Sequence, residues 1–219
     1  TKAGTAVDDQ AAVALLTPDQ PFSGRGGLKL AHALDTFHIE VRGRECLDIG
    51  ASTGGFTDVM LQRGAARVVA LDVGHGQLDW KLRNDERVVV IEHFNARHLT
   101  LAHLPTPVDV VTIDVSFIAL ALLLPRVSDW LLDGKDVVAL IKPQFEAGRR
   151  AVGRGGVVRD PAVHREVIQR VVAAAAASGL GAEDLLRSPL RGPSGNIEFL
   201  LWAKKGAAPK DLASAIERA

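Results

Sequence analysis

The chain has 219 residues, of which 47% are hydrophobic and 24% charged, and its 26 basic side chains balance its 26 acidic ones. This composition predicts a soluble globular protein with one sizeable core. It excludes extensive disorder, a membrane-spanning helix of about 20 apolar residues and charge-driven coating of nucleic acid. The single cysteine, Cys46, excludes an intrachain disulfide, and a reducing, cytoplasmic setting is therefore expected.

Strand-like and helix-like segments alternate along most of the chain. Residues 1–20 contain a short β-like run from Ala11 to Leu16. They are expected to be a linker or the end of a preceding module, since the chain begins with Thr1 and not with Met. The predicted strands are Glu45–Ile49, Arg67–Asp72, Arg87–Ile91, Val108–Asp114, Asp136–Ile141, Asp184–Leu190 and Ile197–Ala203. The predicted helices are one that begins at Gly26, then Gly55–Arg63, Phe117–Leu131 and Pro161–Ala177.

The order of these segments predicts the fold class. Strands that alternate with crossover helices form a mostly parallel sheet with helices on both faces. The last two strands flank a turn at residues 191–196 and are expected to pair as an antiparallel hairpin, which makes the sheet mixed. The chain is therefore expected to be an α/β protein.

A glycine-rich turn after the first predicted strand is the clearest functional signal. Residues 46–56 read CLDIGASTGGF, and a ligand of an open α/β sheet binds where such a turn meets a helix N-terminus. A P-loop would need Lys-Ser/Thr after Gly55, and a dinucleotide fingerprint would need glycine in place of Ser52. S-adenosylmethionine, which has no phosphate, is the third candidate, and the Asp48 carboxylate is expected to receive its ammonium group.

Ionisable residues end three further predicted strands, and one more lies inside a fourth. Asp72 ends the second strand, where an acidic residue binds ribose hydroxyls in Rossmann-type sites. Asp114 and Lys142 end two later strands, and the carboxyl ends of parallel strands meet at one edge of a sheet. Glu198 lies in an otherwise apolar strand, so it is expected to have a charged partner.

A basic, glycine-rich segment follows Lys142. Residues 142–170 carry seven Lys or Arg side chains and three acidic ones, in a chain without net charge. A basic loop beside a catalytic edge would suit a polyanionic substrate, and a solvated basic surface is the alternative. The histidines at positions 75, 93, 98 and 103 do not have the spacing of metal ligands, and no metal is expected.

These motifs together resemble those of the hemolysin-A-type (TlyA) family of ribosomal RNA 2′-O-methyltransferases, which has an FtsJ-like catalytic domain. The resemblance covers about residues 23–202. The matching stretches are SGRGGLKL (23–30), LDIGASTGGFT (47–57), DVGHGQLDW (72–80), LRND (82–85), IKPQFE (141–146) and GPSGNIE (192–198).

The resemblance implies a seven-stranded, mixed, Rossmann-like class I methyltransferase fold with S-adenosylmethionine as cofactor. It also implies methylation of ribose 2′-hydroxyls in 16S and/or 23S ribosomal RNA or ribosomal subunits. Residues 21–205 would then be the methyltransferase domain, 1–20 a linker or remnant of an N-terminal RNA-binding module, and 206–219 a C-terminal helix or tail. The implied catalytic tetrad is Lys29, Asp114, Lys142 and Glu198.

The expected cofactor-binding residues combine the glycine turn with the ends of later strands. They are Asp48, Gly50, Ser52, Gly54, Gly55, Phe56, Asp72, Val73, Asn95, Ala96 and Asp114. Within this set, Asp48 is expected near the methionine tail and Asp72 at the ribose. The segment His93–Ala96 is expected to border the adenine.

The expected chemistry is an in-line attack of a ribose 2′ oxygen on the sulfonium methyl, for which the protein positions both atoms and helps to remove a proton. A lysine ordinarily has a pKa of about 10.4. Lys142 is therefore a base only if the sulfonium and Lys29 disfavour its cation; otherwise it stays charged and orients the hydroxyl. Asp114 is expected near the sulfonium, and Lys29 and Glu198 are expected to hold the other groups.

Two other functions fit the sequence less well. In a methyltransferase for amino groups of bases, Asp114 would be followed by Pro-Pro, but Val-Ser-Phe follows here. A non-catalytic or membrane-active, hemolysin-like protein that retains a cofactor-binding fold would not need Lys142 and Glu198 at these positions. The sequence also lacks an amphipathic or spanning membrane segment.

Overall fold

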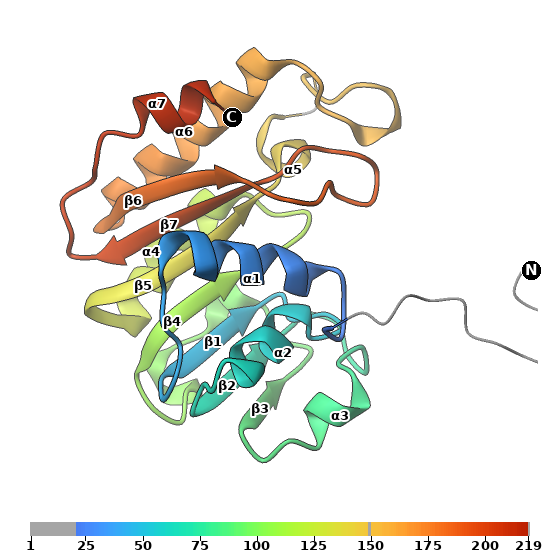
Figure 1. Ribbon diagram of the computed structural model, residues 1–219, viewed down its shortest axis with the longest axis vertical. Helices are drawn as coiled ribbons and strands as arrows, with labels where there is room; N and C mark the ends of the chain where they lie inside the picture. Colours follow the sequence, from blue (N-terminus) through green and yellow to red (C-terminus); the bar gives the residue numbers. More distant parts are fainter. Residues whose placement is uncertain (1–20, 149, 219) are drawn as a thin grey trace, which may run out of the picture.

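The computed structural model describes residues 21–148 and 150–218, and a seven-stranded mixed sheet is its centre (Figure 1). The strand order is β3-β2-β1-β4-β5-β7-β6. The strands are β1 (Glu45–Ile49), β2 (Arg67–Leu71), β3 (Val88–Ile91), β4 (Val108–Ile113), β5 (Leu131–Ile141), β6 (Leu180–Arg187) and β7 (Phe199–Lys205). The α-helices are α1 (Gly26–Phe37), α2 (Gly55–Gln62), α3 (Trp80–Arg83), α4 (Leu124–Trp130), α5 (Pro143–Glu146), α6 (Pro161–Ala177) and α7 (Ala213–Glu217).

Strand pairing brings distant residues to one edge of the sheet. Strands β1 to β5 pair in parallel, and β7 pairs antiparallel with both β5 and β6, so the predicted terminal hairpin and mixed sheet are confirmed. In the β5–β7 register, Ile141 lies opposite Phe199. Lys142, which follows Ile141, and Glu198, which precedes Phe199, therefore lie at the same edge.

Helices cover both faces of the sheet, as the sequence pattern predicts (Figure 1). On one face, α1 and α2 pack through residues such as Leu34 and Met60 against Val110 of β4. On the other, α4 and α6 pack through residues such as Trp130 and Ile168. The central strands are apolar on both sides because both of their faces are buried.

Several predicted boundaries are wrong, and one predicted helix is shorter than expected. The expected helix Phe117–Leu131 is a 3₁₀ turn, η3 (Leu120–Leu122), followed by α4. Phe117 has a left-handed φ of 64°, which a continuous helix does not allow, and Pro125 lies in the first turn of α4. The strand β6 begins earlier than predicted because Leu180 already pairs with Lys205.

Other expectations are confirmed closely or fall outside the described residues. The helix α6 runs from Pro161 to Ala177 as predicted, and Gly179 follows it with a φ of 72°. The β-like run Ala11–Leu16 lies outside the described residues. Within the described part of the chain, no helix is both long and apolar enough to cross a membrane, and no group of three or more side chains is arranged to hold a metal ion.

Candidate active site

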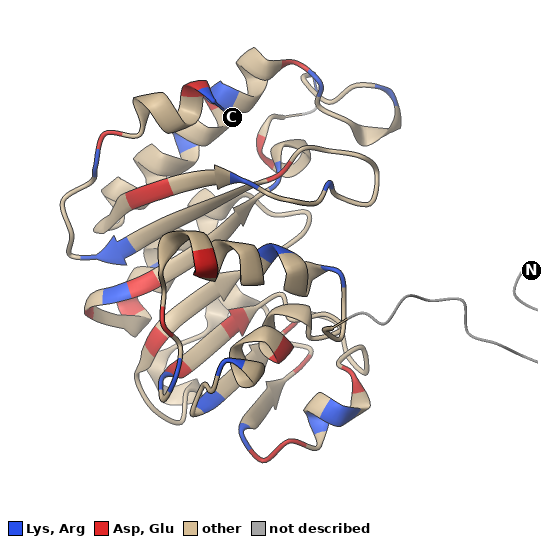
Figure 2. Cartoon of the chain, in the orientation of Figure 1, with Lys and Arg blue, Asp and Glu red and all other residues tan. Residues whose placement is uncertain are grey.

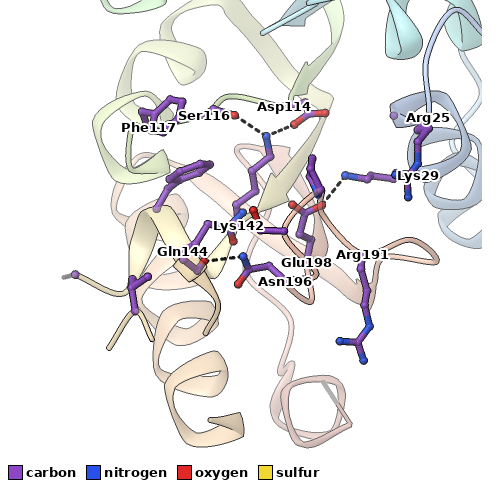
Figure 3. Close-up of a pocket in the computed structure, with 17 residues that line it drawn as sticks. Arg25, Lys29, Asp114, Ser116, Phe117, Lys142, Gln144, Arg191, Asn196 and Glu198 are labelled. Carbon is purple, nitrogen blue, oxygen red and sulfur yellow. Dashed lines mark hydrogen bonds and ion pairs between the residues drawn. The ribbon is translucent and has the colours of Figure 1, made fainter. Parts of the chain in front are cut away.

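Four ionisable side chains from four parts of the chain form two ion pairs at the carboxyl edge of the sheet (Figure 3). Lys29 comes from the second turn of α1, and Asp114 follows β4. Lys142 follows β5, and Glu198 precedes β7. The structure therefore brings together all four residues of the implied tetrad.

The first pair, Lys29 with Glu198, is buried. Lys29 Nζ donates to Glu198 Oε2 at 2.5 Å, and Glu198 is only 1% exposed. A glycine is required beside this pair, since a Cβ at position 192 would lie 2.5 Å from Glu198 Oε1. The predicted charged partner of Glu198 is thus Lys29, from a helix 169 positions away in the sequence.

The second pair, Lys142 with Asp114, is partly open. Lys142 Nζ lies 2.5 Å from Asp114 Oδ1 and also donates to Ser116 Oγ at 3.1 Å. Pro143 begins α5 directly after Lys142, which fixes where the lysine leaves the strand. The ammonium group is held by two oxygens on the loop after β4, and it faces a cavity.

This cavity has a volume of about 1050 Å³ and contains all four residues of the tetrad in its lining. Two arginines, Arg25 and Arg191, lie at its wall. The remaining lining comes from the start of α1, the loop after β4, α5 with the segment after it, and the loop before β7 (Figure 3): Gly26, Ser116, Phe117, Gln144, Phe145, Gly148, Val152, Gly156, Pro193, Ser194 and Asn196. We call it the substrate cavity.

A second cavity, of about 680 Å³, lies beside the ends of β1, β2 and β4. It contains seven of the residues expected to bind the cofactor: Gly50, Ser52, Asp72, Val73, Asn95, Ala96 and Asp114. Apolar side chains such as Ile118 and Leu122 form its opposite wall. Of the segment expected to border an adenine, residues 94–96 line this cavity, and His93 is not among its lining residues. We call it the cofactor cavity.

A third, smaller cavity of about 190 Å³ lies where the glycine turn meets the tetrad. Its lining includes Gly50, Gly55 and Phe56 from the turn and Asp114 and Lys142 from the two strand ends. A Cβ at Gly50, whose φ is 86°, would lie 2.5 Å from the carbonyl oxygen of Asp114. Glycine is therefore required here so that the turn can approach the loop after β4 closely.

The Asp72 carboxylate is fixed at the end of β2. Its Oδ2 accepts the N–H of Ser52 at 2.8 Å, and its Oδ1 accepts the N–H of Gly74 at 2.7 Å. Each carboxylate oxygen has a second lone pair, so Asp72 can still accept two hydroxyl donors from the cavity side. This is the arrangement that a ribose diol requires.

Asp48 does not lie where the sequence predicted it. Its side chain is fully buried and lines none of the three cavities. Oδ2 accepts the hydroxyl of Thr57 at 2.7 Å and Oδ1 that of Thr112 at 3.0 Å. The expected contact with an ammonium group is therefore not available to Asp48 from any of these cavities, and Asp48 supports the glycine turn from behind.

Burial has an electrostatic consequence for Asp48. Loss of hydration raises its pKa from 3.8 to about 7, although the hydroxyls of Thr57 and Thr112 favour the charged form. The folded state therefore binds a proton more tightly than the unfolded state between pH 4 and 7. The contribution of Asp48 to the free energy of unfolding must fall as the pH rises through this window.

We expect Asp48→Asn to remove this pH dependence. Relative to the parent, the variant should gain stability from pH 5 to pH 8, by up to about 3 kcal/mol, because about two pH units of this window lie below the folded-state pKa of Asp48. Urea unfolding of both proteins at several pH values measures the difference. Parallel pH profiles for parent and variant would contradict the assignment.

Gly54 also has a different role from the one expected. It has a φ of 95° and lines none of the three cavities. A Cβ there would clash with the side chains of Leu82 and Leu78, which pack the α3 region against the turn. Gly54 thus permits packing at the back of the turn, and Gly50 and Gly55 provide the close approach at the front.

Sequence reasoning missed an aromatic pair in the substrate cavity, an exposed Phe117 beside a half-buried Phe145. Phe117 is 91% exposed, and its ring centroid lies 4.8 Å from that of Phe145. An aromatic residue three positions after a strand-ending Asp114 is a signal that could have been used. The predicted basic segment 142–170 also lies here (Figure 2), but Arg149 is outside the described residues. Of the segment's described basic side chains, Lys142 alone lines the cavity.

Comparisons with known proteins agree with this geometry. A family model described as FtsJ-like methyltransferase matches residues 22–205. The chain is 48% identical, over all of its length and 83% of the relative, to the 16S/23S rRNA (cytidine-2′-O)-methyltransferase TlyA of Mycobacterium tuberculosis. A solved structure named "Putative hemolysin from Streptococcus thermophilus" superposes with a TM-score of 0.88 at 46% identity. The superposition covers 92% of this chain and 74% of that one.

A more distant solved structure shows the fold alone. Fibrillarin of Aeropyrum pernix, solved with bound S-adenosyl-L-methionine, has a TM-score of 0.59 at 23% identity, with 80% of this chain and 74% of that one covered. The seven-stranded mixed sheet and the cavities at its carboxyl edge define a Rossmann-like methyltransferase. The chain belongs to the FtsJ-like methyltransferase family, and within that family to the TlyA group.

Proposed function

We propose that the protein transfers a methyl group from S-adenosylmethionine to ribose 2′-hydroxyls of ribosomal RNA, in 16S and/or 23S rRNA. The observation that carries this proposal is the small cavity in which the glycine turn and Lys142 meet. It joins the region suited to a cofactor to the region that holds the tetrad. The name of the M. tuberculosis relative supports ribosomal RNA as substrate, which would place this protein in the cytoplasm.

The cofactor cavity suits S-adenosylmethionine. Asp72 offers two acceptor oxygens for ribose hydroxyls, and Phe94, Ile118 and Leu122 offer apolar walls for an adenine ring. Gly50 keeps its turn free of a side chain that would fill the approach to Asp114. When bound, the cofactor supplies an electrophilic methyl group.

The protein's own groups would then position the ribose. Lys142 Nζ, held by Asp114 and Ser116, can donate to the 2′ oxygen or receive its proton, and Lys29 with Glu198 forms the opposite charged wall. Arg25 and Arg191 can pair with backbone phosphates. The Phe117 and Phe145 rings offer faces on which an unstacked base can rest.

The domain limits are part of the same proposal. Residues 21–205 would carry the catalytic function, 1–20 would be a linker or the remnant of an N-terminal RNA-binding module, and 206–219 would be a C-terminal segment, which contains α7. Such a chain is expected to bind the cofactor but to bind RNA only weakly, through salt-sensitive contacts from the loop between α5 and α6.

Methyl transfer to ribosomal subunits tests the proposal. Purified protein would be incubated with unmethylated subunits and cofactor carrying a labelled methyl group. The expected result is label in ribosomal RNA at positions that resist alkaline cleavage, because a methylated 2′ oxygen cannot attack the adjacent phosphate. Label on a base, or none on RNA from either subunit while the cofactor binds, would overturn it.

We expect Asp72→Ala to weaken cofactor binding by at least tenfold, since two hydrogen bonds to a charged acceptor are lost. Calorimetry with S-adenosylhomocysteine measures the dissociation constant. Asp85→Ala is the matched control, because this carboxylate pairs with Arg87 and lines none of the three cavities. Unchanged affinity in Asp72→Ala, or equal affinity of the parent for NAD or ATP, would contradict the assignment.

A further inference from the structure

The loop between β4 and η3 is a wall shared by the two large cavities. Asp114, Ser116 and Phe117 line both the substrate cavity and the cofactor cavity, and Ile118 and Ala119 line the cofactor cavity alone. The position of this short loop therefore determines the shape of both sites at once.

The conformation of the loop is strained. Phe117 has a φ of 64°, a left-handed backbone conformation that is costly for a bulky residue, and its ring is 91% exposed. Neither local preference nor burial of the ring favours this state. Such strain persists only where surrounding contacts hold the segment, and it is frequent at functional sites.

The contacts that hold the loop come from α5, directly after Lys142. Lys142 pairs with Asp114 at the start of the loop, and the Phe145 ring contacts the Phe117 ring. At the far end, Glu146 Oε1 accepts the backbone N–H of Leu120 at 2.8 Å. This bond closes the loop onto α5, although 26 positions separate its partners.

Glu146 has no other assigned role. It lines none of the three cavities, and burial raises the pKa of its carboxyl group although the Leu120 N–H favours the charged form. The Leu120 N–H is the hydrogen-bond donor for this half-buried group, and an acceptor oxygen at the same reach is what the bond needs.

We propose that Glu146 is a positioning residue for methyl transfer: by accepting the Leu120 N–H, it holds the loop so that Phe117 stands in the substrate cavity beside Lys142. The inference rests on the proposed function and assigns a role to a residue outside both cavities. It predicts that Glu146 acts through Phe117 and does not act on Lys142 directly.

Three variants separate this role from a general loss of stability. Glu146→Gln keeps an oxygen acceptor at the same reach, Glu146→Leu has similar volume and no acceptor, and Glu146→Asp keeps the charge but shortens the reach by one methylene. Asp109→Ala is the control, since Asp109 accepts the N–H of Glu45 at 3.1 Å at the opposite end of β4. Kinetics would be measured well below the unfolding midpoint of the least stable variant.

With saturating cofactor, we expect kcat/KM for ribosomal RNA to fall at least tenfold in Glu146→Leu and Glu146→Asp. The same ratio should stay within threefold of the parent in Glu146→Gln and Asp109→Ala. In a Phe117→Ala background, the effect of Glu146→Leu on kcat/KM should shrink to less than twofold, because the Phe117 ring, through which Glu146 acts, is absent. Equal losses in both backgrounds, or full activity of Glu146→Leu, would overturn the proposal.

Hydrogen exchange provides a readout that needs neither substrate nor turnover. The Leu120 amide should exchange at least tenfold faster in Glu146→Asp than in the parent, and at nearly the parental rate in Glu146→Gln. An unchanged rate in Glu146→Asp would show that the bond does not hold the loop. This result would refute the positioning role even if the protein methylates ribosomal RNA, whereas failure of the parent to methylate RNA would refute only the proposed function.

Discussion

Lys142→Ala is expected to abolish methyl transfer, with a loss of at least about 10²–10⁴-fold in rate, while cofactor affinity stays within a few-fold of the parent. The Lys142 ammonium lies in the substrate cavity and in the small junction cavity, but it is absent from the lining of the cofactor cavity. The lysine therefore addresses the ribose hydroxyl. Lys142→Arg should fail as well, because a guanidinium stays protonated and has a different shape.

A matched control lies on the same strand. Lys135 of β5 pairs with Asp109 of β4 at 2.6 Å, much as Lys142 pairs with Asp114, but at the opposite end of the two strands. Lys135→Ala should leave the turnover rate unchanged. Single-turnover methylation measures the rate of methyl transfer, and calorimetry with S-adenosylhomocysteine measures cofactor affinity separately. Substantial turnover by Lys142→Ala, with RNA binding intact, would show that the catalytic assignment is wrong.

Breaking the Lys29–Glu198 pair is expected to have the largest effect on stability. Lys29→Met leaves the Glu198 carboxylate buried without its cation, and loss of one partner of a buried pair typically costs about 3–5 kcal/mol. The double variant Lys29→Met with Glu198→Leu should recover most of this loss, since two apolar side chains of similar volume replace the pair. Urea unfolding of the parent, the single variant and the double variant measures the difference.

Activity should not recover with stability. The Lys29–Glu198 pair forms one wall of the substrate cavity, opposite Lys142 and Asp114, so an apolar replacement removes the charges that face the ribose (Figure 3). The double variant is expected to be stable and at least tenfold less active. Parental activity in the stable double variant would show that this pair serves folding alone. Equal stability of the parent and Lys29→Met would contradict the view that the two residues are buried as a charged pair.

Substitutions in the two ion pairs have different expected effects, one mainly on stability and the other on turnover, because the two pairs differ in burial. Glu198 is 1% exposed and Lys29 7%, so their charges are stabilised mainly by each other. Lys142 and Asp114 are partly open to the cavity, where water screens both charges. Removing one partner of the first pair is therefore costly, because the other charge stays buried, whereas the second pair remains accessible to a substrate.

Local sequence pattern is enough to specify the α/β fold and part of the site. Strands with apolar residues on both faces predicted a buried parallel sheet, and Asp114 and Lys142 at strand ends predicted a charged edge, because parallel strands end at the same side. The glycine turn was recognisable because Gly50 and Gly55 occupy fixed places between a strand and a helix. These features depend on local pattern, which the sequence carries directly.

The contacts between distant residues depend on long-range packing, which local pattern does not specify. The pairing of Lys29 with Glu198 depends on the packing of α1 beside β7, and no local pattern specifies it. The burial of Asp48 behind the turn depends on hydroxyls supplied by α2 and β4. The left-handed Phe117, which interrupts a predicted helix, is held by contacts with α5, since long-range contacts can outweigh local preference wherever they offset its cost.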